Sequence, residues 1–152
     1  MDTGYYHSPV GILEIKADDK AIISVQLCDK IAWRTKSKNP IIRQSIIQLS
    51  EYFAGKRRSF DLPLFAKGTE FQEKVWDALL QLPYGKTVSY AEVAKIVRHP
   101  KAWRAVGSAN GKNPIAIIIP CHRVIASDGT LGGYAHGLDI KKQLLDLEKQ
   151  NK

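Results

Sequence analysis

The sequence has little cysteine: Cys28 and Cys121 are the two among 152 residues. Two cysteines are too few for a disulfide framework, and the chain contains neither a C-x-x-C nor an H-x-x-x-H spacing typical of zinc sites. No apolar run approaches membrane-spanning length, and Met1 is not followed by a basic and then apolar signal. We therefore expect a cytoplasmic protein with reduced cysteines, without a metal, a cofactor or a membrane partner.

Acidic side chains are also scarce, since 15 Asp and Glu stand against 23 Lys and Arg for a formal net charge of +8. Much of this surplus lies in residues 84–123, where Glu92 is the single carboxylate. The cations of the segment are Lys86, Lys95, Arg98, Lys101, Arg104, Lys112 and Arg123. Such a concentration of positive charge favours a polyanionic partner such as nucleic acid, and a generic solubilising surface is the alternative.

The N-terminal part of the chain has patterns of both strand and helix. The stretch "GILEIKADDKAIISVQL" alternates apolar and polar residues around a turn, which predicts a hairpin of Ile12–Lys16 and Ile22–Leu27. Asn39 as an N-cap, Pro40 at the first helical position and Gly55 as a stop predict a helix that follows the hairpin.

The stretch "KRRSFDLPLFAKG" has no clear period and indicates a domain boundary. We predict an N-terminal α/β domain at residues 1–62, a linker at 63–68 and a second domain at 69–152. The fold class is α+β: a small sheet-plus-helix domain precedes a mostly helical domain with a helix-turn-helix and a cysteine after a short strand.

Two capping boxes, Thr69 with Gln72 and Ser89 with Glu92, predict helix starts in the second domain. The second box opens "YAEVAKIV", and a further helix is predicted for "PKAWRAVGSANG", beginning at Pro100. Two short helices joined by three or four residues form a helix-turn-helix pattern. The small residues of the second helix would let its backbone approach a surface such as DNA closely, and tight helix packing is the alternative.

Cys121 comes directly after Ile115–Ile119, an apolar run that predicts a buried strand ended by Pro120. A thiolate is a strong nucleophile, and His122 is placed to take the thiol proton if another group orients it. Glu148 is the candidate for that group, because the last predicted helix places it on the face that we expect to be buried. A solvated position near the chain end is the alternative for this carboxylate.

These residues belong to a specific constellation. The stretch "NPIAIIIPCHRVIASDGTLGGYAHGLDIKKQLLDLE" closely resembles the O(6)-alkylguanine-DNA alkyltransferases, whose signature is P-C-H-R-V after an apolar strand. The stretch "GKTVSYAEVAKIVRHPKAWRAVGSA" resembles their helix-turn-helix. The resemblance is dense from Thr69 to Glu148 and only architectural over residues 1–62.

The resemblance implies catalytic roles for four residues. Cys121 would accept the alkyl group, and His122, connected through a water to Glu148, would act as the base that yields the thiolate. Asn113 would hold the turn that presents the cysteine.

It also implies a set of substrate-binding residues. The substrate set consists of Tyr90, which would crowd a phosphate, Arg104, which would fill the space left in the duplex, and Val124, Tyr134 and Ala135, which would contact the flipped base. From the small residues and cations of the segment 84–123, we predict a DNA-binding set that consists of Lys101, Ala102, Ala105, Gly107 and Arg123.

The implied activity is DNA repair. The protein would flip O(6)-alkylguanine, and less well O(4)-alkylthymine, out of double-stranded DNA from the minor groove and transfer the alkyl group irreversibly to its own cysteine. It would act once, as a monomer. Several family members have a small residue at the position of His136, at the rim of the pocket. We therefore expect this chain to differ from them in its handling of bulky alkyl groups.

Three rival hypotheses stay open at this point. Alkyltransferase-like proteins bind damaged DNA but have Trp where this chain has Cys121. A helix-turn-helix regulator would use Cys121 as a redox sensor. A cysteine hydrolase is the third, although no oxyanion-hole motif is visible.

Overall fold

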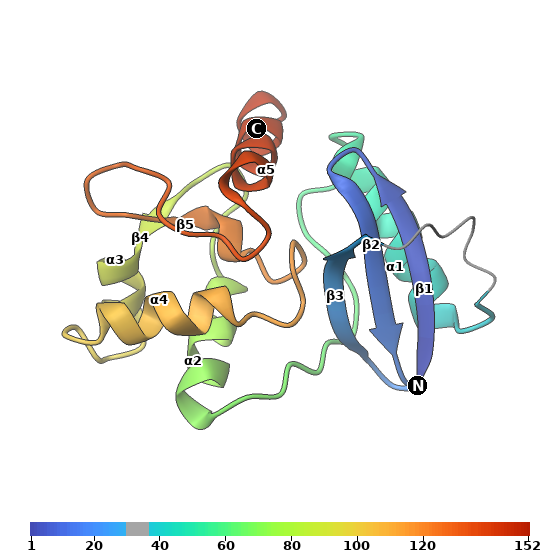
Figure 1. The fold of residues 1–152 in the computed structure, drawn as a ribbon, viewed down its shortest axis with the longest axis horizontal. Helices are drawn as coiled ribbons and strands as arrows, with labels where there is room; N and C mark the ends of the chain where they lie inside the picture. Colours follow the sequence, from blue (N-terminus) through green and yellow to red (C-terminus); the bar gives the residue numbers. More distant parts are fainter. Residues whose placement is uncertain (30–36) are drawn as a thin grey trace. The chain divides into compact units, whose positions relative to one another are not determined.

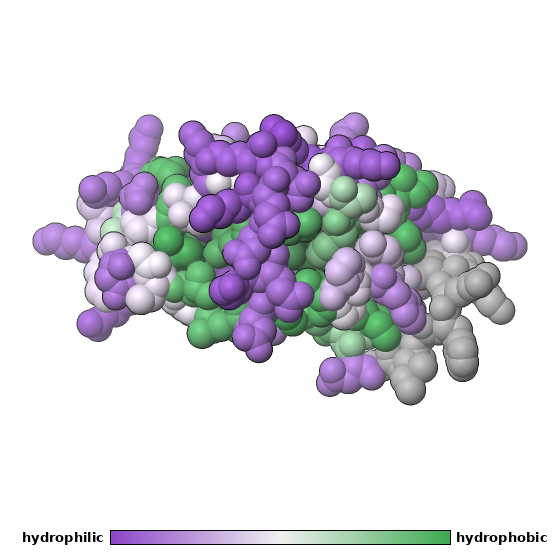
Figure 2. Space-filling view, turned by 90° about the horizontal axis from the view of Figure 1, so that it is seen from above, coloured by the Kyte–Doolittle hydropathy of each residue, from purple (hydrophilic) through white to green (hydrophobic). Residues whose placement is uncertain are grey.

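The computed structural model describes residues 1–29 and 37–152, which form two compact units (Figure 1). The N-terminal unit contains the described residues up to Lys67 together with Pro114–Ala116. The C-terminal unit contains Gly68–Asn113 and Ile117–Lys152. No helix among the described residues is both long and apolar enough to cross a membrane. Hydrophilic side chains dominate the face drawn in Figure 2, and apolar residues show between them.

The N-terminal unit is built on a three-stranded antiparallel sheet. Its strands are β1 (Asp2–Ser8), β2 (Gly11–Ala17) and β3 (Ile22–Cys28), in the order β1-β2-β3. The predicted hairpin is confirmed as β2 and β3. Sequence reasoning missed β1, whose residues are DTGYYHS and lack the alternating aliphatic side chains of the other two strands.

Helix α1 (Pro40–Phe53) lies along the sheet in Figure 1, and it starts where the sequence predicts. Asn39 caps it by accepting a hydrogen bond from the Ile41 N–H at 2.8 Å, and its amide donates to the Asp18 carbonyl at 2.9 Å. The helix ends before Gly55, which has a φ of +75° that glycine adopts without strain. The predicted cap and stop are therefore both confirmed.

The predicted strand over Ile115–Ile119 is wrong. The Val25 N–H donates to the Pro114 carbonyl and the Ala116 N–H to the Val25 carbonyl, each at 2.9 Å, so the segment pairs with β3 through an isolated bridge between Ile115 and Val25. Ile117 then turns the chain with a φ of +71°, a conformation that is strained for a β-branched residue. A short apolar run indicates burial, which is correct here, but it does not distinguish a strand from a buried turn.

The C-terminal unit is mostly helical. Its elements are α2 (Glu70–Leu79), β4 (Val88–Ser89), α3 (Tyr90–Ile96), α4 (Trp103–Gly111), a 3-10 helix (Cys121–Arg123), β5 (Val124–Ile125) and α5 (Leu138–Gln150). Strands β4 and β5 pair in parallel, so the short strand near Cys121 follows the cysteine rather than preceding it. The fold class, with its small sheet domain and helix-turn-helix domain, is otherwise confirmed.

Both predicted capping boxes are present, at the starts of α2 and α3. Helix α4 begins three residues later than predicted, because Ala102 donates its N–H to the His99 carbonyl at 2.8 Å and closes a separate turn. The buried Trp76 ties α2 to α4 by donating its ring N–H to the Ala109 carbonyl at 2.9 Å. A Cβ on Gly68 would lie 2.5 Å from the Trp76 ring, so only glycine fits beside it.

Candidate active site

The loop that presents Cys121 is held by two buried asparagines of the C-terminal unit. Asn113 donates its side-chain amide to the Ile119 carbonyl at 2.8 Å, and Asn110 donates to the Cys121 carbonyl at 3.2 Å. The role predicted for Asn113 thus has a structural counterpart. Asn110 was missed, although it stands four residues after Val106 on the buried face of α4, where a polar residue is an anomaly.

A buried charge cluster lies next to the cysteine. The His122 Nε2 is 2.6 Å from Glu148 Oε2, and both side chains are at most 1% exposed. The expected water between His122 and Glu148 is therefore wrong, since the two side chains are in direct contact. The Gly85 N–H also donates to Glu148, at 3.1 Å, which anchors the carboxylate.

Arg123 is part of this cluster, and the prediction that it binds DNA is corrected. Its Nε donates to Glu148 Oε1 at 2.8 Å and its Nη2 to Glu148 Oε2 at 3.1 Å, while Nη1 donates to the Leu82 carbonyl at 2.8 Å. The residue is 6% exposed, so its guanidinium does not reach a surface. The sequence assigned it to DNA by its charge, whereas the buried carboxylate of Glu148 requires a cation beside it.

The hydrogen bonds fix the protonation state of His122. The His122 and Arg123 side chains hold the pKa of Glu148 well below its ordinary value, against the effect of burial, so the carboxylate is ionised and only accepts. His122 therefore donates from Nε2. Burial lowers the pKa of His122, so the ring is neutral and Nδ1 keeps a lone pair. Nδ1 has no hydrogen-bond partner among the described residues, which leaves it free to accept a proton.

Cys121 itself is a protonated thiol at rest. Burial raises its pKa, and hydrogen bonds from the Asn113 and Tyr134 side chains and the charge of Lys141 oppose that rise. The cysteine is 5% exposed, so its thiol is buried. Burial and the nearby Cys121 also raise the pKa of Tyr134, so its hydroxyl remains a proton donor.

Lys141 is a functional candidate that sequence reasoning missed. It is fully buried on α5, and its ammonium donates to the carbonyls of Val124 at 2.7 Å, Leu131, and Gly133 at 3.0 Å. The signal was its position three residues before Leu144 and seven before Glu148, which places it on the buried face of the helix.

A cavity of about 450 Å³ gathers most of the predicted substrate residues. Its lining consists of Tyr90, Trp103, Arg104, Gly107, Asn110, Gly111, Gly133, Tyr134 and Ala135. Val124 is fully buried and lies outside this lining, and its carbonyl already accepts from Lys141. A carbonyl has two lone pairs, so one further hydrogen bond to a base is compatible with this contact.

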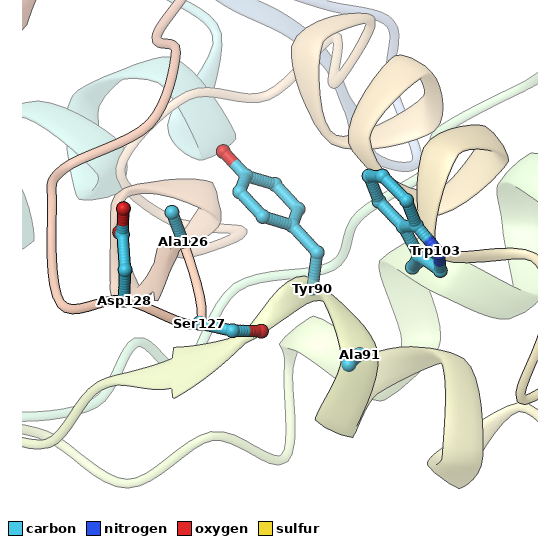
Figure 3. A pocket seen from close by; sticks show the side chains of 6 residues that line it. All are labelled: Tyr90, Ala91, Trp103, Ala126, Ser127 and Asp128. Carbon is cyan, nitrogen blue, oxygen red and sulfur yellow. The ribbon is translucent and has the colours of Figure 1, made fainter.

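A second cavity, of about 430 Å³, shares Tyr90 and Trp103 with the first. Figure 3 shows the Tyr90 ring between Trp103 at the start of α4 and the loop that carries Ala126, Ser127 and Asp128. Gly132, with a φ of +70°, lies so close that a Cβ there would be 2.8 Å from the Tyr90 hydroxyl. The loop after β5 therefore packs against Tyr90 and fixes the position of its ring.

The predicted DNA-binding residues on α4 and just before it are accessible. Lys101, Arg104 and Ala105 are exposed, and Ala102 and Gly107 are half-buried. The Arg104 guanidinium lies 5.1 Å from the centre of the Trp103 ring, and Trp103 is 48% exposed. Sequence reasoning gave Trp103 no role, although an exposed indole beside a cation is typical of nucleic-acid contacts.

Comparison with known families covers both units. A family model described as "6-O-methylguanine DNA methyltransferase, DNA binding domain" matches residues 70–150. A second model, "6-O-methylguanine DNA methyltransferase, ribonuclease-like domain", matches residues 1–66. A methylated-DNA–protein-cysteine methyltransferase of Methanosarcina mazei is 46% identical over 155 residues, which cover 97% of this chain and 98% of the relative.

Solved structures agree with this match. The crystal structure of Mycobacterium tuberculosis OGT in complex with DNA superposes with a TM-score of 0.89 at 42% identity, covering 97% of this chain and 92% of the other. An O6-methylguanine DNA methyltransferase from Methanococcus jannaschii has a TM-score of 0.71 at 28% identity, covering 97% and 94%. The similarity thus extends over nearly the full length of the chain.

Proposed function

The chain belongs to the 6-O-methylguanine DNA methyltransferase family, and from that premise we propose that it repairs O6-alkylguanine in duplex DNA by transferring the alkyl group to Cys121. The observation that carries the proposal is the buried Cys121 thiol beside His122. Glu148, which Arg123 keeps ionised, accepts from His122 Nε2, so that Nδ1 is free to accept a proton. These side chains all lie within residues 69–152, the predicted second domain, to which we assign the chemistry.

The transfer begins with proton movement. His122 Nδ1 takes the Cys121 proton, and the ionised Glu148 stabilises the imidazolium through Nε2. The thiolate then attacks the alkyl carbon, a C–S bond forms, and the bond from that carbon to guanine O6 breaks with its electron pair on the guanine. The Tyr134 hydroxyl donates to the leaving base. The proton that His122 took from Cys121 ends on the released guanine.

The alkyl carbon is hidden within the base stack, so the nucleotide must rotate out of the duplex, at a cost of a few kcal/mol. We assign to Arg104, which is exposed, the role of occupying the vacated space, and to Tyr90, which the loop after β5 packs against, the role of crowding the phosphate. Ala102, the N-cap of α4, and Gly107 within it are small and half-buried, which suits a close approach to the minor groove.

The product is a thioether, which none of the described side chains is placed to cleave, so each molecule acts once. A monomer suffices, because the assigned residues all come from one chain. We place the activity in the cytoplasm, where the thiol stays reduced. His136 lies 5.6 Å from the Tyr134 ring centre to centre, and we propose that it narrows the range of bulky alkyl groups at the pocket.

The decisive experiment uses duplex DNA with radiolabelled O6-methylguanine. One label per molecule should appear on the peptide that contains Cys121, and Cys121→Ser should abolish transfer while DNA binding persists. Cys28→Ser is the matched control and should transfer normally, since Cys28 lies on β3 of the other unit. Label on Cys28, or repeated turnover, contradicts the proposal; label that stays on the DNA favours a binding-only or regulatory protein.

A further inference from the structure

The ammonium of Lys141 is satisfied in an unusual way. Its three hydrogen bonds go to backbone carbonyls, those of Val124, Leu131 and Gly133. These carbonyls stand before and after the turn at residues 126–130, so one side chain of α5 fixes both ends of the loop. Gly133 and the next residue, Tyr134, line the substrate cavity. Lys141 therefore determines the position of the loop that forms one wall of the pocket.

The charge of Lys141 is not neutralised by a carboxylate. Glu148 is the only buried acidic side chain among the described residues, and it is bonded to both Arg123 and His122. Lys141 forms no ion pair with an acidic residue in the described part of the chain. The titratable groups that interact with it are Cys121, His122 and Tyr90, whose ring centre is 5.9 Å from the Lys141 Nζ.

A buried cation without a counter-charge costs free energy, and that cost is relieved when a negative charge forms nearby. The Val124 carbonyl that Lys141 binds lies at the end of the 3-10 helix that begins with Cys121. Of the groups that interact with Lys141, Cys121 is the one that becomes negative during the reaction. We propose that Lys141 is a positioning residue for alkyl transfer, which supplies the counter-charge of the Cys121 thiolate and, through the same ammonium, holds the pocket loop in place. This inference rests on the proposed function.

The electrostatics agree with the geometry. Burial lowers the pKa of Lys141 from 10.5 to about 8, and the negative charge of Cys121 acts in the opposite direction. The two groups therefore titrate as a coupled pair, in which protonated Lys141 favours the thiolate and the thiolate favours protonated Lys141. His122 removes the thiol proton, whereas Lys141 makes the resulting anion stable in a buried site.

The test measures the thiolate without DNA. In a Cys28→Ser background, Cys121 is the only thiol, and its rate of alkylation by iodoacetamide is followed against pH. Lys141→Met should move the midpoint of this profile to higher pH by about one unit or more, with a roughly tenfold lower rate per unit at neutral pH. Lys141→Arg keeps a charge and should leave the midpoint unchanged or lower it.

Lys142→Met is the matched control, because Lys142 is the next residue on α5 and its side chain is 68% exposed. It removes the same charge from the helix and should leave the profile unchanged. The proposal is overturned if Lys141→Met follows the Lys142→Met profile, or if Lys141→Arg moves the midpoint upward as far as Lys141→Met. If Lys141→Met does not fold, the direction of the Lys141→Arg shift decides.

The role of Lys141 and the proposed repair function can be contradicted independently of one another. A chain that takes no methyl group from O6-methylguanine DNA but still shows the Lys141-dependent profile retains a thiolate site and lacks the repair activity. Normal methyl transfer with a profile insensitive to Lys141 removes only the role of Lys141.

Discussion

The two units bury polar side chains in different ways. In the N-terminal unit the buried polar groups are neutral: Asn39 caps α1, and Gln48 exchanges two hydrogen bonds with the Asp61 backbone, at 3.0 and 2.9 Å. In the C-terminal unit the buried groups include Arg123, Lys141 and Glu148, which are charged. Neutral groups satisfied by backbone stabilise a fold, whereas buried charges cost desolvation free energy. The proposed alkyl transfer gives the second unit a use for these costly charges.

The largest expected effect comes from breaking the charge cluster of the C-terminal unit. Glu148→Ala leaves Arg123 buried without a carboxylate and should lower the free energy of unfolding by about 3–5 kcal/mol. It also removes the group that orients His122, so methyl transfer by the folded fraction should fall. Urea denaturation measures the first effect and single-turnover transfer the second. Asp146→Ala, at an exposed position of the same helix, is the control; an equal loss in both variants would contradict the role of burial.

Buried Lys141 should make the stability of the C-terminal unit change with pH in the alkaline range. The folded chain binds the Lys141 proton less tightly than the unfolded chain, because the pKa falls from 10.5 to about 8. Between these pH values the unfolded chain holds more protons, so the free energy of unfolding should rise with pH, by up to about 3 kcal/mol from this residue. Chemical denaturation at a series of pH values measures the rise, and Lys141→Met should abolish it.

Acid has the opposite effect on the same unit. The pKa of His122 is lowered by burial, so the unfolded chain binds its proton first as the pH falls through the ordinary value of 6.5. Glu148 adds a loss below its ordinary value of 4.5, because its folded pKa is also lowered. Stability should therefore decrease from pH 6.5 downward. Melting curves of His122→Asn should lack the first part of this decrease, and a variant that retains it would assign the effect to another group.

The neutral cluster of the N-terminal unit should behave differently. Gln48→Ala removes both hydrogen bonds to Asp61 and should cost about 1–3 kcal/mol of unfolding free energy. Because no charge is involved, the loss should be the same at pH 5 and pH 9, and transfer to Cys121 by the folded protein should be unchanged. Denaturation at the two pH values is the measurement; a pH-dependent loss would erase the contrast between the units.

How much the sequence predicts also differs between regions. Local signals were read correctly: the caps at Asn39, Thr69 and Ser89 depend on side chains within three residues of the groups they bind. The resemblance named Cys121 and His122. Contacts between distant segments were not predictable in this way.

Two residues show why the site was only partly predictable. Arg123 reads as a surface cation until Glu148, 25 residues further on, is known to lie against it. Ile117 turns the chain with a positive φ, which a run of isoleucines does not indicate, because β-branched side chains disfavour that conformation. The burial of Lys141 could have been predicted from its position on the helix. Buried lysines are so uncommon, however, that its charge predicts an exposed side chain.

The smallest expected effect separates folding from DNA binding within the C-terminal unit. A Cβ on Gly107 would lie 3.8 Å from the Tyr90 ring, an ordinary contact, and the position has a helical φ within α4. Gly107→Ala should therefore leave stability unchanged or raise it by roughly 0.5–1 kcal/mol, because alanine is the better helix former. If α4 approaches the minor groove closely at this position, the added methyl group should still weaken binding to duplex DNA. Fluorescence anisotropy at fixed salt, with melting curves of the same samples, compares the two; unchanged affinity would mean that the small residues of α4 serve packing within the unit rather than contact with DNA.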